Sequence, residues 1–186
     1  MNKGKLLIIS GPSAGAGKDT LRTMFLQHHP DWNQPPSITT RQSRPGELQT
    51  KQMSFVSQRK FKQWQKEGKF LETDFHADHW YGTLRNPVEE LLGQGKNVLL
   101  RIDVNGALEV KRQKPEAVLV FIKSENAQVL EARIRARGSE TEKQIQKRLK
   151  LAEHELTFVS QFDHIIINAT NKQNEALAAL EAIVLN

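Results

Sequence analysis

The feature that most constrains the fold of this chain is a glycine-rich segment between an apolar run and a helical pattern. Residues 6–9 are all aliphatic, and residues 11–20 read GPSAGAGKDT. A strand that ends in a glycine-rich turn and opens a helix forms a cradle for phosphate, because glycines let backbone N–H groups converge on phosphate oxygens. The helix N-terminus adds the positive end of its dipole, and Lys18 adds a point charge. The segment therefore predicts a strand, a phosphate-binding loop and a helix.

The spacing within this loop departs from the usual phosphate-loop pattern. That pattern places four residues between the first glycine and the Gly-Lys-Ser/Thr sequence, whereas five separate Gly11 from Gly17 here, and Asp19 follows Lys18. The extra residue must bulge or reshape the loop. A carboxylate cannot offer Mg²⁺ a neutral hydroxyl, so Thr20 is the candidate magnesium ligand. The alternative for the whole segment is an ordinary Gly/Ala turn at the end of a strand.

A second polar segment, residues 37–47 with the sequence SITTRQSRPGE, carries two arginines. The planar guanidinium groups of Arg41 and Arg44 suit bidentate binding of a phosphate, and three neighbouring hydroxyls add donors. The alternative is two solvated charges in a turn. The first segment can hold a nucleoside triphosphate and the second an anionic acceptor, so the two together favour a phosphotransferase.

Length and residue usage exclude several other classes of protein. The chain has 186 residues, enough for one domain with a small inserted lobe, and it has no cysteine, which excludes disulfides and thiolate metal sites. No apolar run approaches the ~20 residues of a membrane span, and the N-terminal run is shorter than a signal h-region of about 7–15 residues. We therefore expect a cytoplasmic protein without a membrane partner.

The net charge of +6 favours an anionic partner. The basic residues are scattered, and one Tyr and three Trp offer little surface for stacking on nucleic-acid bases. We therefore expect phosphorylated small molecules as partners and no nucleic acid. The sequence leaves open whether the chain is a monomer or a homodimer.

Short aliphatic runs alternate with helical patterns over much of the chain, and runs of this kind are typical of strands buried on both faces of a parallel sheet. The runs lie at residues 6–9, 98–102, 118–122 and 165–167. Helical patterns occupy residues 19–28, a segment from Asn86-Pro87 onward, a segment after a capping-box sequence at 139–142, and residues 172–185. The alternation predicts an α/β fold with a three-layer core.

Residues 35–85 have a different pattern. Their apolar runs are short and mixed with polar residues, and they lie at 37–41, 53–57, 70–75 and 80–84, with a helical piece at 61–66. This pattern predicts a small mixed-β lobe inserted into the parallel-sheet core.

Further motifs follow the glycine loop in a fixed order. They are TTRQSRPGE at 39–47, FVS at 55–57, FLE at 70–72, YGT at 81–83, IDVNG at 102–106, RIRARGSE at 133–140 and KRL at 147–149. With this order and spacing, the chain resembles guanylate kinase almost from end to end. The resemblance implies transfer of the γ-phosphoryl group of ATP to GMP with Mg²⁺. It also implies a single domain with a core (about 1–34, 86–128 and 158–186), an acceptor-binding lobe (about 35–85) and a helical lid (about 129–157).

The resemblance assigns roles in ATP binding and catalysis. The residues at the ATP are Ser13, Ala14, Gly15, Ala16, Gly17, Lys18, Asp19, Thr20 and Asn168, with Asn168 near the adenine. The catalytic residues are Lys18, Arg41, Arg133, Arg137 and Arg148, of which the last three reach the ATP phosphates from the lid region. Such positive charge suits phosphoryl transfer, whose transition state spreads negative charge over the phosphoryl oxygens.

The resemblance also assigns the acceptor site. Its residues are Ser37, Arg41, Arg44, Glu72, Tyr81, Thr83, Arg101 and Asp103. The two arginines of the polar loop and Tyr81 would contact the GMP phosphate. Glu72 would accept hydrogen bonds from the guanine N1–H and amine, and Thr83 would touch the base. Without the resemblance, Glu72 reads as a solvated strand carboxylate, and the lid arginines read as a charged helix face.

Three positions depart from the family pattern, and they keep two other functions open. Met53 stands where the family usually has Tyr, Arg101 stands where it has an acidic residue, and the glycine loop is longer. Arg101 can pair with Glu72, or donate to a base oxygen as arginine does to guanine. One alternative is a guanylate-kinase-like binding module. The other is a kinase for a different phosphorylated acceptor, such as IMP, XMP or a sugar phosphate.

Overall fold

The structure is a computed structural model that describes residues 3–43, 52–76, 78–136, 138 and 141–185. The strands are β1 (Leu6–Ser10), β2 (Ser37–Thr39), β3 (Met53–Phe55), β4 (Phe70–His76), β5 (His79–Leu84), β6 (Val98–Arg101), β7 (Val118–Lys123) and β8 (His164–Ile167). The helices are α1 (Lys18–His28), α2 (Gln58–Lys66), α3 (Arg85–Gly93), α4 (Val104–Gln113), α5 (Ala127–Ala136), α6 (Glu142–Leu156) and α7 (Gln173–Leu185), with a 3₁₀ turn, η2, at Val159–Gln161.

The chain folds into two compact units, each built from separate segments of sequence. Unit 1 contains Met1–Leu6, Asp31–Leu100 and Asn105–Ala117, and unit 2 contains Leu7–Pro30, Arg101–Val104 and Val118–Asn186. The chain therefore passes from one unit to the other several times. Unit 1 includes the mixed sheet, and unit 2 includes the glycine loop with the helices α1, α5, α6 and α7.

A parallel sheet of strand order β6-β1-β7-β8 and a separate mixed sheet confirm the predicted α/β fold. All the aliphatic runs predicted as core strands are strands of the parallel sheet. Strand β1 is buried along its whole length and pairs with β7 from Leu7 opposite Val118 onward. Continuous burial of this kind is what a strand inside a parallel sheet requires.

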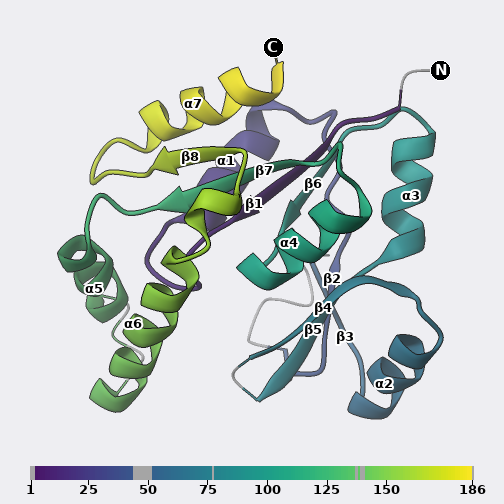
Figure 1. Cartoon of the computed structure of the whole chain (residues 1–186), viewed down its shortest axis with the longest axis horizontal. Helices are drawn as coiled ribbons and strands as arrows, with labels where there is room; N and C mark the ends of the chain where they lie inside the picture. Colours follow the sequence, from purple (N-terminus) through teal and green to yellow (C-terminus); the bar gives the residue numbers. More distant parts are fainter. Residues whose placement is uncertain (1–2, 44–51, 77, 137, 139–140, 186) are drawn as a thin grey trace. The chain divides into compact units, whose positions relative to one another are not determined.

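The last strand of the parallel sheet differs from the prediction of burial on both faces. Ile166 is buried, whereas Ile165 and Ile167 are 50% and 53% exposed. Alternate residues of a strand point to opposite faces, so β8 is covered on one face only. Helix α7 contacts β8, and the two lie side by side in Figure 1.

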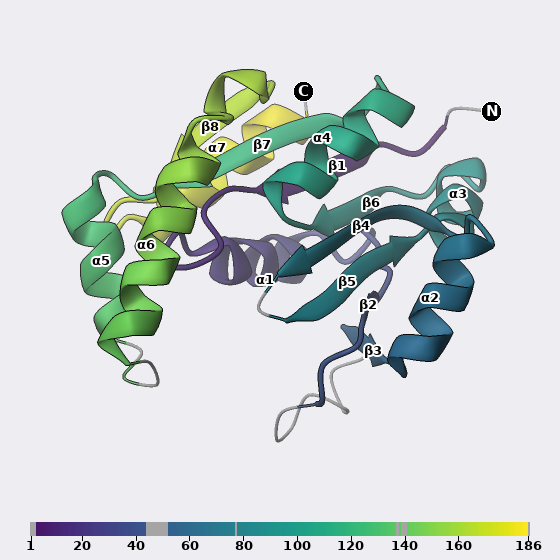
Figure 2. The ribbon, with the colours of Figure 1, turned by 60° about the horizontal axis from the view of Figure 1, so that its bottom comes forward.

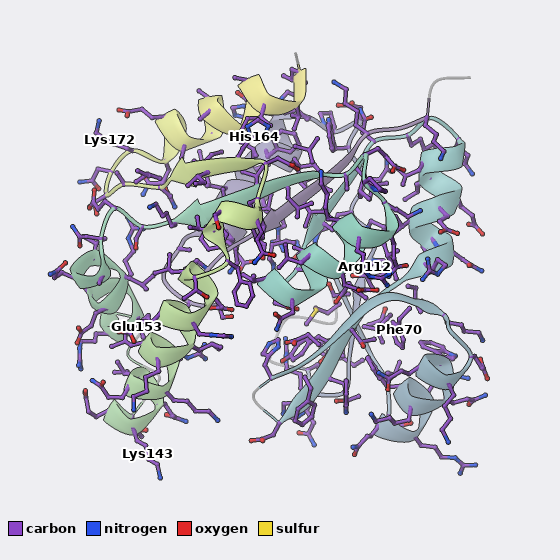
Figure 3. All side chains as sticks on the ribbon, viewed as in Figure 1. Phe70, Arg112, Lys143, Glu153, His164 and Lys172 are labelled. Carbon is purple, nitrogen blue, oxygen red and sulfur yellow. The ribbon has the colours of Figure 1, made fainter. Side chains whose placement is uncertain are left out.

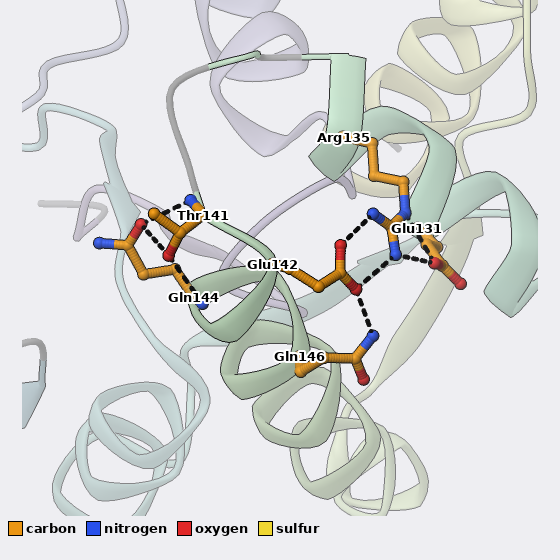
Figure 4. Close-up of polar contacts among 6 residues, drawn as sticks. All are labelled: Glu131, Arg135, Thr141, Glu142, Gln144 and Gln146. Atoms are coloured by element: carbon orange, nitrogen blue, oxygen red, sulfur yellow. Dashed lines mark hydrogen bonds and ion pairs between the residues drawn. The ribbon is translucent and has the colours of Figure 1, made fainter.

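Two helix starts differ by a few residues from the predicted ones. Helix α3 begins at Arg85, so Asn86 and Pro87 lie within its first turn, where proline is tolerated because its missing N–H has no intrahelical partner. Helix α6 is capped by Thr141, whose side chain accepts from the Gln144 N–H while the Gln144 side chain accepts from the Thr141 N–H (Figure 4). A capping box is therefore present, but it is formed by Thr141 and Gln144 and not by the predicted sequence at 139–142, of which Ser139 and Glu140 lie outside the described residues.

The mixed sheet has the strand order β3-β2-β5-β4, and it confirms the predicted mixed-β region. Helix α2 lies beside the strands of this sheet in Figure 2. Its Phe61 joins Ile38 and Phe70 in one apolar cluster. The other face of these strands carries Ser37, Tyr81 and Thr83, because alternate residues point to opposite faces. Unit 1 therefore has one apolar face on α2 and one polar face.

Candidate functional site

The glycine loop of unit 2 connects β1 to α1 in the predicted order. Gly15 and Gly17 have φ angles of 76° and 80°, in the left-handed region that favours glycine. A Cβ atom on Gly17 would lie 2.2 Å from Asn168 Nδ2, so no larger residue fits there without rearrangement. The loop thus brings Asn168, from the end of β8, against the start of α1.

Lys18 begins α1 and is buried. Its Nζ donates to the carbonyl oxygens of Gly11 at 2.6 Å and Pro12 at 2.5 Å, so the side chain folds back over the loop. Burial lowers the pKa of Lys18 from 10.5 to about 8, and the nearby carboxylate of Glu155 opposes this shift most strongly. A cation held so close to backbone amides gives the loop a concentrated positive charge.

Several side chains from α5 and the end of β8 fasten the loop from outside. Arg133 Nη1 donates to the Gly15 carbonyl at 3.3 Å and the Asn168 carbonyl at 3.0 Å, and Asn168 Nδ2 donates to the Ala16 carbonyl at 3.0 Å. Ala14 packs in an apolar cluster whose other members are Leu130, Ile134, Ile145 and Ala152. Thus the lengthened loop is packed against the helices α5 and α6.

Glu155 of α6 is a site residue that the sequence analysis missed. Its carboxylate is buried and accepts hydrogen bonds from the Ser13 N–H at 2.8 Å and from the Ser13 hydroxyl. A signal was present, because Glu155 follows Ala152 by three residues and so lies on the apolar stripe of its helix. A carboxylate on a buried stripe needs a polar partner.

Asp19 and Arg101, two positions that depart from the family pattern, lie close together. Asp19 Oδ1 lies 3.2 Å from Arg101 Nε and 3.4 Å from Arg22 Nη1. The negative charge that Asp19 adds beside the phosphate loop is therefore balanced by arginines. Thr20 is exposed in the first turn of α1. Within the described residues, no three His, Asp or Glu side chains gather in the manner of a preformed metal site.

Three predicted acceptor residues of unit 1, together with Met53, form a row across the mixed sheet. Met53, Ser37, Thr83 and Glu72 are register partners on successive strands β3, β2, β5 and β4. The register of β4 shifts between Phe70 and Glu72, and this irregularity brings Glu72 opposite Thr83. Glu72 is buried, and its Oε1 accepts from the Thr83 hydroxyl at 2.6 Å.

Tyr81 lies next in line on the same face of β5. Its ring stacks on that of His76 with a centroid distance of 4.2 Å, and His76 Nδ1 lies 2.5 Å from Asp74 Oδ2. Arg41 donates to the Gln42 carbonyl and lies over the Phe55 ring, 5.3 Å from its centroid. The lobe therefore holds Tyr81 and Arg41 in defined side-chain contacts.

The remaining predicted residues are distributed as follows. Arg148 is half-buried on α6, and Asp103 is half-buried between β6 and α4, where its charge raises the pKa of Lys18 slightly. Arg44 and Arg137 lie outside the described residues. In the part of the chain that the structure describes, no helix is long and apolar enough to span a membrane.

A strand of a parallel sheet, a glycine loop and a lysine at the head of a helix define a P-loop nucleotide-binding fold. The family model for guanylate kinase matches residues 3–186. The chain is 43% identical over 166 residues to a guanylate kinase of Synechocystis sp., covering 89% of this chain and 86% of the relative. It is 40% identical over 183 residues to a guanylate kinase of Caldanaerobacter subterraneus, covering 98% and 87%.

Solved structures have the same fold. A crystal structure of guanylate kinase from Anaplasma phagocytophilum superposes with a TM-score of 0.79 at 24% identity, covering all of this chain and 86% of the other. A shikimate kinase from Bacteroides thetaiotaomicron gives 0.52 at 13% identity, covering 98% and 99%, so it shares the fold only. The chain belongs to the guanylate kinase family, as its motifs predicted, and it is a nucleoside monophosphate kinase.

Proposed function

We propose that the protein transfers the γ-phosphoryl group of ATP to GMP, giving ADP and GDP, with ATP held by unit 2 and the GMP base by unit 1. The observation that carries the choice of GMP is the buried carboxylate of Glu72 in the polar row of the mixed sheet. Guanine presents two adjacent N–H donors, N1–H and the amine, and a carboxylate accepts from both. Adenine lacks this pair of donors.

The ATP site consists of Ser13–Thr20 of the glycine loop and α1, with Lys18 on the phosphates and Asn168 near the adenine. Asn168 Oδ1 supports this assignment, because it is buried and has no hydrogen bond within the described residues. A buried acceptor without a donor costs free energy, so a ligand N–H at this place is favourable. Arg133, Arg137 and Arg148 neutralise charge that develops on the transferring phosphoryl group.

The proposed GMP site rests on the row of the mixed sheet in unit 1. Glu72 and Thr83 read the base, and Ser37, Tyr81, Arg41 and Arg44 hold the phosphate. The resemblance also assigns Arg101 and Asp103 to the acceptor, and both belong to unit 2. Phosphoryl transfer needs positioning and positive charge, and no covalent intermediate on the protein.

Magnesium is part of the proposed reaction, and the residues at the loop suit it. Mg²⁺ prefers oxygen ligands and binds with few protein groups beside nucleotide phosphates. Thr20 follows Lys18 and Asp19 directly in the sequence and offers an exposed hydroxyl. When bound, the ion would neutralise charge between the β- and γ-phosphates.

The proposed organisation is a single domain with core (about 1–34, 86–128 and 158–186), acceptor lobe (about 35–85) and lid (about 129–157). We place the protein in the cytoplasm, where ATP and GMP are abundant, as a monomer or homodimer. Size-exclusion chromatography with light scattering distinguishes the two oligomeric states.

The test is release of ADP from Mg-ATP, coupled to NADH oxidation, with GMP, dGMP, IMP, XMP and AMP offered separately. GMP-selective turnover is the expected result. Turnover on IMP or XMP in preference to GMP would indicate that Arg101 has changed which purine base the site selects. Absence of turnover on every acceptor, with folded protein, would contradict the proposed function and favour the binding module.

A further inference from the structure

The peptide group between Pro12 and Ser13 is held by opposite charges at its two ends. Its carbonyl oxygen accepts from Lys18 Nζ at 2.5 Å, and its N–H donates to Glu155 Oε2 at 2.8 Å. The two ends of a planar peptide point in opposite directions, so the cation and the anion pull on it along one line. Charge-assisted hydrogen bonds are about twice as strong as neutral ones, and bonds in a chain polarise one another. The orientation of this peptide is therefore fixed.

Glu155 uses both carboxylate oxygens for this contact. Its second oxygen, Oε1, accepts from the Ser13 hydroxyl, and the residue is only 6% exposed. Burying a carboxylate costs several kcal/mol unless charge and hydrogen bonds compensate it. The roles proposed above for phosphoryl transfer leave this buried group without a function.

Helix α6 contacts the loop at two successive residues. Ala14 packs with Ala152 in the apolar cluster, and one helical turn further along α6 Glu155 binds Ser13. The apolar contact and the ionic contact thus come from one face of one helix. The loop has one residue more than the usual pattern, and these two contacts fasten the part that contains it.

We propose that Glu155 is a positioning residue of the ATP site, which holds the Pro12–Ser13 peptide so that the phosphate loop is preformed before ATP binds. The inference rests on the proposed function and assigns a role within its ATP site. Hydrogen-bond donors that are already oriented add no reorganisation cost to binding. Loss of this orientation should therefore weaken the binding of ATP and ADP. GMP is held mainly by residues of unit 1, so its binding should not depend on Glu155.

The experiment compares Glu155→Gln and Ser13→Ala with the control Glu153→Gln. Glu153 lies on the same helix and is exposed (Figure 3). Calorimetric titration with ADP and the KM values for Mg-ATP and GMP are measured for each variant. We expect Glu155→Gln to lower the affinity for ADP and raise the KM for ATP, each about tenfold. Ser13→Ala should change the same two quantities about threefold, because the bonds lost are charge-assisted. The control should change neither quantity, and the KM for GMP should stay within about twofold throughout.

Wild-type ADP affinity in a folded Glu155→Gln variant would overturn the inference. Equal losses for ADP and GMP, together with a lower melting temperature, would show a merely structural role and would also overturn it. If Glu155→Gln fails to fold, Glu155→Asp, which keeps the charge on a shorter side chain, takes its place in the same comparison and should also weaken ADP binding. A wild-type protein that binds ADP but does not phosphorylate GMP would contradict the proposed function, while the comparison of ADP affinities would still test Glu155.

Discussion

Lys18 shows at the scale of one residue how burial and function are linked. A lysine enclosed by protein is costly to keep charged, and its pKa of about 8 reflects that cost. Two carbonyl oxygens and the nearby Glu155 keep the cation in place in the absence of nucleotide. The charge is therefore close to the place where the triphosphate is proposed to bind.

Replacing Lys18 by alanine should lower kcat/KM for ATP by roughly 10²–10³-fold, because one preorganised charge on the phosphates is lost. The fold should survive, since the backbone of the loop is also fastened by Arg133 and Asn168. Coupled ADP release and circular dichroism measure the two effects. Lys172→Ala, at an exposed lysine labelled in Figure 3, is the control. Near-wild-type turnover in the Lys18→Ala variant would contradict the proposed role.

The activity should also depend on pH through Lys18. The free enzyme loses the Lys18 proton as pH rises through about 8, so kcat/KM for ATP should fall on the alkaline side of that value. The unfolded chain keeps this proton up to about pH 10.5, so the contribution of Lys18 to stability rises between the two values and is lost as pH falls through about 8. Lys18→Arg, which remains charged, should remove the alkaline decline, and a flat wild-type profile beyond pH 9 would be contrary to expectation.

Sequence reasoning located the residues whose type and spacing carry chemistry, and it missed those defined by contacts. Lys18 could be found because a lysine after glycines at a helix start has one common use. The ion pair between Asp19 and Arg101 joins residues far apart in sequence, so no local pattern predicts it. Glu155 was overlooked because its partner, Ser13, is equally remote.

At the scale of elements, α6 supplies both an ionic and an apolar contribution to holding the loop. Its N-terminus is closed by the capping box, and Arg135 of α5 binds Glu142 and Glu131 beside it (Figure 4). Its inner face reaches Ala14 and Ser13. Fraying at the first turn of α6 therefore loosens a helix on which the loop depends.

Thr141→Ala should lower the free energy of unfolding by about 1 kcal/mol, because it removes an N-cap. Thr141→Ser keeps the hydroxyl and should be close to wild type. Lys143→Ala, at an exposed position of the same turn, is the matched control (Figure 3). Urea unfolding measures the free energies, and hydrogen exchange of the α6 amides shows where the loss occurs. Equal stability of the Ala and Ser variants would show that the cap contributes nothing.

Elements could be predicted where one periodicity dominates. Strand β1 is aliphatic except for its last residue, Ser10, and was found to within a residue. Strand β8 has the same kind of sequence, yet three of its four residues are exposed, because coverage of a strand depends on remote elements. The register shift in β4, which sets Glu72 opposite Thr83, also has no sequence signal of its own. It depends on pairing with β5.

At the scale of the whole molecule, the residues proposed to bind the GMP base and those proposed to bind ATP belong to different units. Glu72 belongs to unit 1, whereas Lys18, Asn168 and Glu155 belong to unit 2. A substitution of Glu72 should therefore weaken GMP binding and leave the binding of ATP and ADP at the glycine loop unchanged.

Glu72→Gln should raise the KM for GMP at least tenfold, since the amide accepts through one oxygen only and a charged acceptor is lost. The affinity for ADP should stay within about twofold of wild type. Kinetics with varied GMP and calorimetry with ADP measure the two quantities. Glu116→Gln, at an exposed carboxylate of unit 1, is the control. A comparable loss of ADP affinity would contradict the division of ligands between the units.

The passage of the chain between the two units also has a consequence for its synthesis. Leu7 of β1 pairs with Val118 of β7, which leaves the ribosome more than a hundred residues later. At about 5–20 residues per second, β1 waits roughly 5–20 s for its neighbour while most of unit 1 is made. During that interval the aliphatic residues 6–9 of β1 lack their partner strand β7. We therefore expect slow translation of residues 31–117 to increase aggregation of the nascent chain.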